Sequence, residues 1–228
     1  YSIDYDALAE ASGFVDEGTA SLPVSPIVLT LPIAASADTY NAVLTVVNSS
    51  TGCTNDYPIS VIINPNPTIT FGANPAVCQG ETSANLTYSA TTGGADEYQV
   101  DYNAAANVAG FADVAYTALP VSPVGLVVPG AVAAGTYSAT IVVRNSTTGC
   151  VSSSINKAVI VNTTPSITLG SNPSVCAGTT TANLTYSATS GSPNRYSIDY
   201  DPTAEGQGFV DVTNAVLPAS PIVLTVPG

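Results

Sequence analysis

The sequence predicts an all-β protein built from tandem β-sandwich domains. Three observations point to this fold: a long internal repeat, about seven strand-like segments per repeat, and turn-forming residues about every ten positions. The repeat is marked by Tyr1-Ser-Ile-Asp-Tyr5, which returns as Tyr98-Gln-Val-Asp-Tyr102 and as Tyr196-Ser-Ile-Asp-Tyr200. A period of roughly 97–98 residues lets each unit bury a core of its own.

The repeat divides the chain into three parts. Residues 1–64 are expected to be the C-terminal part of one unit, residues 65–162 a complete unit, and residues 163–228 the N-terminal part of a third. The connecting segments, Pro65-Asn-Pro67 and Thr163-Thr-Pro165, contain proline and no glycine, so we expect stiff linkers. The sequence therefore looks like a window cut from a longer array.

The first elements of a unit follow from alternation and from turn residues. Tyr1–Asp6 alternates large apolar and polar residues, which predicts a strand with one buried face. A short strand or edge segment is expected at Gly13–Asp16, and a strand at Ile27–Leu31, which lies between two prolines. The alanine-rich segments Ala7–Ser12 and Ala104–Ala109 are long enough for only a turn or two of helix.

The clearest strand of each unit is predicted at Thr39–Asn48 and again at Thr136–Asn145. Its alternation places Tyr137, Ala139, Ile141 and Val143 on one face. The Gly-Thr-Tyr lead-in is typical of the penultimate strand of immunoglobulin-like sandwiches, so we expect that type of Greek-key sandwich. The remaining expected strands are Ser60–Asn64, Thr68–Gly72, Asn85–Ala90, Ala158–Asn162 and Ser166–Gly170.

Charge and composition exclude several classes of function. The net charge is −13, and Arg144, Lys157 and Arg195 are the only basic residues. Such a chain repels phosphate backbones and anionic lipid, so nucleic-acid binding is not expected. No apolar run reaches the length of a membrane span. Histidine is absent, which removes the commonest general base and zinc ligand, and no catalytic residue is predicted.

The four cysteines recur at fixed places in the repeat and predict structural disulfides in an oxidising compartment. Cys78 and Cys150 belong to one unit, and we favour a bridge between them within that domain. The alternative is a pair of bridges across the linkers, Cys53–Cys78 and Cys150–Cys176.

A repeated pattern of oxygen ligands indicates a calcium site as one alternative. Each unit carries an Asp-x-Asp/Asn pair on one strand face and a further aspartate about ten residues later, and such oxygens are the ligands that calcium prefers. The alternative is a purely structural role, in which the strand face is solvated and the later aspartate fixes a turn. The positions are Asp4, Asp6, Asp16, Asp101, Asn103, Asp113, Asp199, Asp201 and Asp211.

Four motifs together resemble a known family. They are Asn-Pro-x-Val-Cys-x-Gly at 74–80 and 172–178, Gly-Thr-Tyr-x-x-x-Ile-x-Val at 135–143, Asn-Ser-Thr-Thr-Gly-Cys at 145–150, and Val-Ile-Val-Asn before a proline linker at 159–162. The whole chain resembles the tandem immunoglobulin-like or PKD-like repeats of large Bacteroidota cell-surface adhesins, including the filamentous adhesin of gliding motility. The resemblance implies export to the cell surface and a repeat without an active site.

The expected function is therefore structural and adhesive. We expect a non-catalytic part of a long extracellular filament, whose partners are the neighbouring repeats of the chain and further copies of itself. The alternatives are a calcium-dependent module that binds glycan or protein, and a stalk attached to a secreted hydrolase. Apart from calcium, no cofactor is expected.

Overall fold

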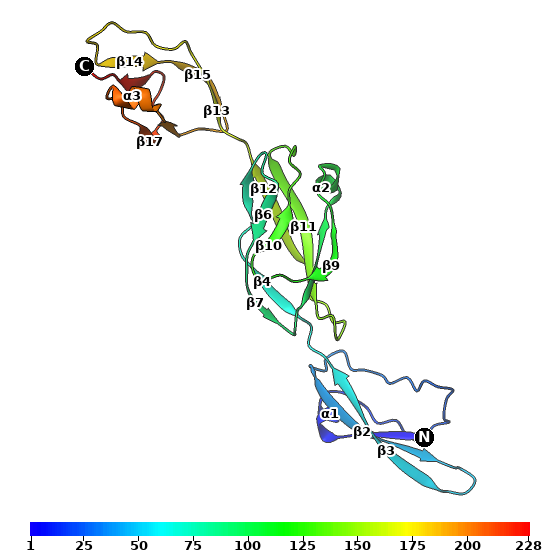
Figure 1. Ribbon diagram of the computed structural model, residues 1–228. Helices are drawn as coiled ribbons and strands as arrows, with labels where there is room; N and C mark the ends of the chain where they lie inside the picture. The colour runs from blue at the N-terminus through cyan, green and yellow to red at the C-terminus, as the bar shows by residue number, and fades with distance from the viewer.

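The computed structural model describes all residues from Tyr1 to Gly228. Strands make up 44% of the chain and helices 7%, which confirms the all-β prediction. Strands pair only within three segments, which we call the N-terminal lobe (residues 1–63), the central lobe (residues 68–162) and the C-terminal lobe (residues 166–228). Figure 1 shows the three lobes in a row, with the central lobe between the other two.

The central lobe has a five-stranded sheet in the order β5-β12-β11-β8-β9 and two smaller pairs, β4–β7 and β6–β10. Strand β5 runs parallel to β12, and all other pairs are antiparallel. The elements are β4 (Thr68–Phe71), β5 (Ala76–Cys78), β6 (Ser83–Leu86), β7 (Tyr88–Thr92), β8 (Glu97–Tyr102), α2 (Ala104–Val108), β9 (Val114–Ala118), β10 (Val124–Val127), β11 (Gly135–Arg144) and β12 (Ile155–Asn162).

One core of 17 buried residues holds these sheets together. Leu86 and Val124 come from the β6–β10 pair, and Val100, Ile141 and Val143 come from the five-stranded sheet, so the two layers share the core. The predicted face of β11 is confirmed, because its alternate residues point into this core while the residues between them are less buried.

The N-terminal lobe is a three-stranded sheet in the order β1-β2-β3, with β1 (Ser2–Tyr5), β2 (Asp38–Val47) and β3 (Thr54–Ile63). Its core has six buried residues, among them Phe14 and Tyr40. Two predictions were wrong here. Gly13–Asp16 is not a strand, although Phe14 packs in the core, and Ile27–Leu31 is not a strand either. The equivalent strand β10 pairs with β6, and this lobe has no strand in the place of β6.

The C-terminal lobe consists of three two-stranded pairs, β13–β15, β14–β18 and β16–β17. Only two of its residues, Ala182 and Ile222, are fully buried. Its elements are β13 (Ser166–Leu169), β14 (Thr181–Leu184), β15 (Tyr186–Ser190), β16 (Arg195–Ile198), α3 (Pro202–Gly206), β17 (Val212–Val216) and β18 (Ile222–Thr225).

The helices are single short turns, as the alanine-rich segments predicted. α1 (Ala7–Ala11), α2 and α3 each contain five residues. None of them has the length and apolar character needed to cross a bilayer.

Candidate functional site

The late aspartate of each unit accepts a hydrogen bond from the backbone of a strand. In every lobe its Oδ1 receives the N–H of the tyrosine that closes the Tyr-x-x-Asp-Tyr segment, so it fixes the returning loop against that strand. The pairs are Asp16 with Tyr5 at 2.8 Å, Asp113 with Tyr102 at 2.8 Å, and Asp211 with Tyr200 at 2.9 Å.

Burial raises the pKa of the Tyr102 phenol to about 12, and the charges of Tyr98 and Asp113 add smaller contributions. The phenol therefore stays protonated at neutral pH, and Tyr102 serves as a core residue.

The second residue of each Asp-x-Asp/Asn pair caps a helix. Its Oδ1 accepts the backbone N–H three residues later at 2.8 Å, which is the ordinary geometry of an N-cap. For Asp6 this hydrogen bond from Ala9 is the main reason that the carboxyl pKa is lowered. The three caps are Asp6 on α1, Asn103 on α2 and Asp201 on α3.

The structure does not assemble the predicted calcium ligands into a metal site. The first aspartate of each pair, at positions 4, 101 and 199, is exposed on the strand surface. No group of three or more Asp, Glu, His or Cys side chains lies close enough to hold an ion. The oxygens at the other two positions already accept hydrogen bonds from backbone N–H groups. A structural role in fixing turns therefore describes these residues better than calcium binding.

The expected bridge between Cys78 and Cys150 is not formed, and all four cysteines are free. Cys78 is paired with Asn162 at one end of the central lobe, whereas Cys150 follows the opposite end of β11. A ten-residue strand spans about 30 Å, far more than the roughly 6 Å between the Cα atoms of a disulfide.

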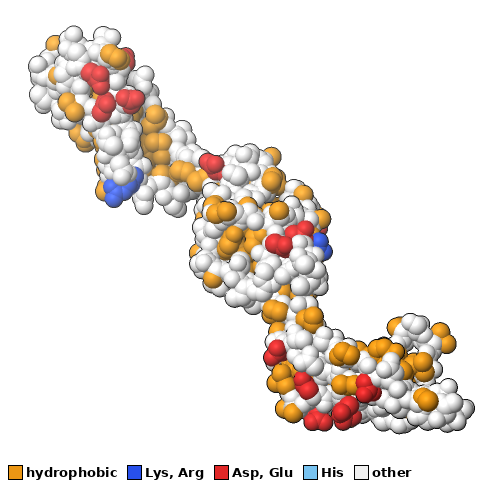
Figure 2. Space-filling view, turned by 60° about the horizontal axis from the view of Figure 1, so that its bottom comes forward, with side chains coloured by type: hydrophobic (Ala, Val, Ile, Leu, Met, Phe, Trp, Pro, Cys, Tyr) orange, Lys and Arg blue, Asp and Glu red, His pale blue; other side chains and the backbone are white.

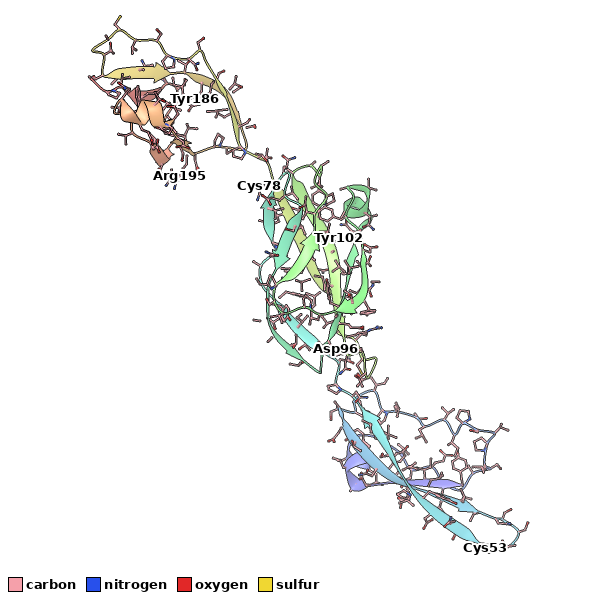
Figure 3. The ribbon with its side chains drawn as sticks, viewed as in Figure 1. Cys53, Cys78, Asp96, Tyr102, Tyr186 and Arg195 are labelled. Atoms are coloured by element: carbon pink, nitrogen blue, oxygen red, sulfur yellow. The ribbon has the colours of Figure 1, made fainter.

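The alternative bridge between Cys53 and Cys78 is not formed within one chain either. Cys53 lies at the far tip of the β2–β3 hairpin, and Cys78 lies at the end of the central lobe next to the C-terminal lobe (Figure 3). Cys176 is also free and exposed, so the Cys150–Cys176 bridge is absent as well.

Both cysteines of the central lobe lie next to a linker. The Sγ of Cys150 is 3.9 Å from the carbonyl oxygen of Asn64, which precedes the first linker. At the other end, the residue after Cys78 is Gln79, whose carbonyl accepts the hydroxyl of Thr164 at 3.1 Å. The cysteines therefore mark the two junctions of the lobe.

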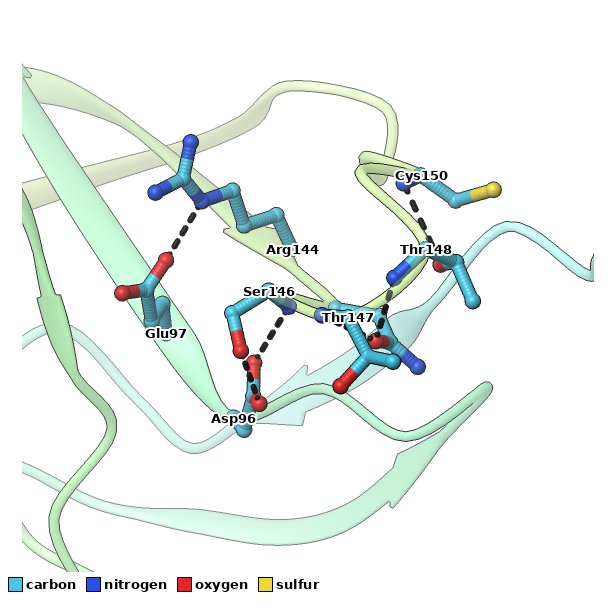
Figure 4. Close-up of polar contacts among 8 residues, drawn as sticks. Asp96, Glu97, Arg144, Ser146, Thr147, Thr148 and Cys150 are labelled. Carbon is cyan, nitrogen blue, oxygen red and sulfur yellow. Dashed lines mark hydrogen bonds and ion pairs between the residues drawn. The ribbon is translucent and has the colours of Figure 1, made fainter.

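The β11–β12 turn is anchored by a set of polar contacts that the sequence did not reveal. Asp96 accepts the backbone N–H of Ser146 at 2.7 Å and its hydroxyl at 2.6 Å (Figure 4). Beside it the Arg144 guanidinium forms an ion pair with Glu97, and its Cζ lies 4.0 Å from the centre of the Tyr116 ring. The turn itself was predicted, but Asp96 is 50 residues away in the chain, and no local pattern signals such a partner.

These hydrogen bonds predict an acid-sensitive contact at the junction. The Ser146 hydroxyl and then its N–H lower the pKa of Asp96 below its usual value of 3.8. A carboxyl with a lowered folded-state pKa contributes stability above the unfolded pKa and loses it as pH falls through the folded pKa. Asp96→Asn should therefore flatten the loss of unfolding free energy below about pH 4, as measured by urea unfolding over a pH series.

The matched control for Asp96 is Asp101→Asn, because the exposed Asp101 carboxylate accepts no hydrogen bond. This variant should keep the acid slope of the unaltered chain. Equal slopes for Asp96→Asn and the unaltered chain would show that the Ser146 contacts contribute nothing.

A hollow with a volume of about 640 Å³ lies on the outer face of the five-stranded sheet. Its only charged side chains are Asp101 and Lys157, and the Nζ of Lys157 already donates to the carbonyl of Gly72 at 2.7 Å. The lining therefore has the polar character of an open sheet surface and presents no paired catalytic groups.

Acidic side chains lie on the surface of all three lobes, and the basic side chains in the same view lie far from one another (Figure 2). With three basic residues in the whole chain, no basic patch can form.

The chain matches no protein-family model, and no curated protein matches it.

Proposed function

We propose that this chain is a non-catalytic, load-bearing segment of a long extracellular surface protein, built from tandem immunoglobulin-like sandwiches. The observation that carries the proposal is the parallel pairing of β5 with β12, which ties an early strand of the central lobe to its last strand.

The topology of the central lobe supports the immunoglobulin-like assignment. Strands β4 and β5 belong to different sheets, and β5 lies parallel to the last strand, β12. A tyrosine at the start of the penultimate strand also bonds back to the chain, as in a tyrosine corner. The Tyr137 hydroxyl donates to the carbonyl of Ala133 at 2.8 Å, and the Tyr40 hydroxyl donates to Ser36 at 2.9 Å.

The β5–β12 contact is placed to resist extension. The two linkers leave from opposite ends of the central lobe, so a pull on the chain slides β5 and β12 past each other along their length (Figure 1). In this direction the hydrogen bonds of a parallel ladder are loaded together. The ladder includes Ile160 N–H to the Pro75 carbonyl and Gln79 N–H to the Asn162 carbonyl, both at 2.9 Å.

Each linker is close-packed against the lobe that follows it. A Cβ added to Gly93 would lie 2.7 Å from the Cα of Pro67, so the turn after β7 fits against the linker only because it carries glycine. Gly191 meets Pro165 in the same way, at 2.8 Å. Proline in both linkers reduces their freedom further, which supports a stiff array.

The cellular setting follows from the resemblance and the composition. Repeats like those of Bacteroidota surface adhesins place the chain outside the cell, where it would extend an adhesive or motility-related protein from the surface. A net charge of −13 with few basic residues suits an exposed filament that must not adhere to anionic surfaces. Neighbouring repeats of the same chain are its first partners.

Stretching of single molecules held at the two ends tests the load path. Unfolding of the central lobe, residues 68–162, should release about 300 Å of chain, given about 3.3–3.6 Å per extended residue. Gln79→Pro removes the N–H that donates to Asn162 and should lower the force of this step while leaving the length released unchanged.

The matched control for the load path is Ala177→Pro, at the equivalent position of the C-terminal lobe, where no strand pairs with this segment. It should leave the force of the central lobe unchanged. An unaltered force in Gln79→Pro would contradict the proposed shear contact.

A further inference from the structure

Cys150 lies at the junction through which the chain enters the central lobe. Its Sγ is 3.9 Å from the carbonyl oxygen of Asn64, the residue that precedes the first linker. The turn that carries Cys150 is tied to the same junction, because the Asn145 side chain donates to the Gly93 carbonyl at 3.0 Å and Gly93 packs against Pro67. These contacts set the position of Cys150 relative to the preceding repeat.

Cys78 lies at the opposite junction, where the chain leaves the central lobe (Figure 3). It is in register with Asn162 in the parallel pairing of β5 with β12, and the next residue, Gln79, donates its N–H to the Asn162 carbonyl at 2.9 Å. The Gln79 carbonyl accepts the hydroxyl of Thr164 in the second linker at 3.1 Å. Cys78 is exposed, so its thiol is accessible at this junction.

Asn64 and Asn162 occupy the same position of the repeat, and each precedes a linker that ends in proline. The two linkers also pack alike, since a Cβ built on Gly93 or Gly191 would lie 2.7 or 2.8 Å from the Cα of that proline. The two junctions therefore share one local geometry. In a repeat that follows Asn162, the cysteine equivalent to Cys150 would lie against the Asn162 carbonyl.

We propose that a disulfide crosses each junction of the array, from Cys78 of one repeat to the cysteine of the following repeat that is equivalent to Cys150. We call this disulfide the junction clamp. It rests on the tandem array of the proposed function. It differs from both pairings expected from the sequence, which joined Cys78 to Cys150 of its own repeat or to Cys53 of the preceding one.

The distances at the junction suit a disulfide. Paired strands lie about 4.8 Å apart, which places the Cys78 backbone at about that distance from Asn162. A sulfur as close to the Asn162 carbonyl as Cys150 is to Asn64, at 3.9 Å, comes within reach of Cys78, since the Cα atoms of a disulfide are roughly 6 Å apart. As the S–S bond forms, the two thiols lose two protons and two electrons. A small disulfide such as oxidised glutathione accepts them and is cleaved to two thiols.

The junction clamp would change which part of the chain carries load. The segment between its two cysteines becomes a closed loop, and this loop contains the central lobe from β6 to β12. Force applied to the ends of the array passes through the S–S bond and bypasses the loop. A clamped lobe would therefore stay folded under a force that unfolds the same lobe in a reduced array.

The test extends the full 228-residue chain with its own sequence. Residues 131–162 are added after Gly228, which is equivalent to Gly130, so the third repeat is completed and carries a copy of Cys150. The original residue is changed, Cys150→Ser, so that the copy gives a unique peptide. After incubation with oxidised glutathione at low protein concentration, peptide maps should show the copied cysteine linked to Cys78 in most molecules.

A second extended chain tests the other junction independently. Residues 67–97 are added before Tyr1, which is equivalent to Tyr98, and supply a copy of Cys78 to the first repeat, while the original residue is changed, Cys78→Ser. We expect this copy to be linked to Cys150. In each extended chain the matched control has serine in place of the copied cysteine and should contain no disulfide between its own cysteines.

Stretching of the first extended chain gives a further readout. In the oxidised form the step of about 300 Å assigned to the central lobe should be absent, and reductant should restore it. Absence of the expected linkage in both extended chains would overturn the junction clamp, and so would linkage of Cys78 to Cys53 or Cys176. The unfolding force in reductant still reports on the β5–β12 contact, so the clamp and the load-bearing role can fail separately.

Discussion

Leu86→Ala is expected to lower the unfolding free energy of the central lobe by about 3–5 kcal/mol, near the top of the range for buried leucine. The Leu86 side chain is fully buried, at 0% exposure, between the β6–β10 pair and the five-stranded sheet. The substitution loses the favourable free energy of burying the leucine side chain. It also leaves a cavity that the packed layers fill only in part. Urea unfolding followed by tyrosine fluorescence measures the effect.

The repeat supplies a matched control for this substitution. Leu184 occupies the equivalent position of the C-terminal lobe but is only half-buried. At a concentration where the chain is monomeric, Leu184→Ala should cost about 1–2 kcal/mol, because less apolar surface leaves water there. Equal losses for the two variants would mean that the central core is not packed as described.

Phe111→Ala should have an effect of similar size, about 3–5 kcal/mol. The Phe111 ring lies between two tyrosines, with centroid distances of 5.0 Å to Tyr102 and 4.7 Å to Tyr137. The substitution removes both aromatic contacts, whereas the backbone hydrogen bond from residue 111 N–H to the Ala106 carbonyl, 3.1 Å long, is retained. Calorimetry of the full chain would show the transition of the central lobe shifted to lower temperature.

Phe209→Ala is the control for the aromatic cluster. Phe209 stacks on Tyr200 at 5.0 Å but lacks the third ring, since no strand equivalent to β11 covers it. Its replacement should therefore cost clearly less than that of Phe111. A larger loss at Phe209 would contradict the assignment of the main core to the central lobe.

Much of the fold could be predicted because the strands of this protein are short and strongly alternating. The period-2 pattern of residues 136–145 located β11 and its buried face, with boundaries shifted by a single residue. The pattern failed at Ile27–Leu31, which has the composition of a strand but pairs with no strand among residues 1–63. A strand is a property of two chain segments, and local sequence describes only one of them.

The candidate site could not be predicted in the same way. The repeated carboxylates have the spacing of calcium ligands, and in the structure they cap helices and bind the N–H groups of Tyr5, Tyr102 and Tyr200. Both roles require an oxygen at the same position, so spacing alone does not separate them. The disulfide prediction failed because Cys78 and Cys150 belong to one unit but lie at its two ends.

The central claim is that residues 65–162 form a self-sufficient unit whose core needs no neighbour. Every residue of the main core lies between Ile69 and Val161. The most direct test is to produce residues 65–162 alone and to compare their thermal unfolding with the corresponding transition of the full chain. The account predicts a single cooperative transition within a few degrees of that transition. A segment that unfolds without cooperativity, or that needs residues 1–64 or 163–228 to fold, would contradict it.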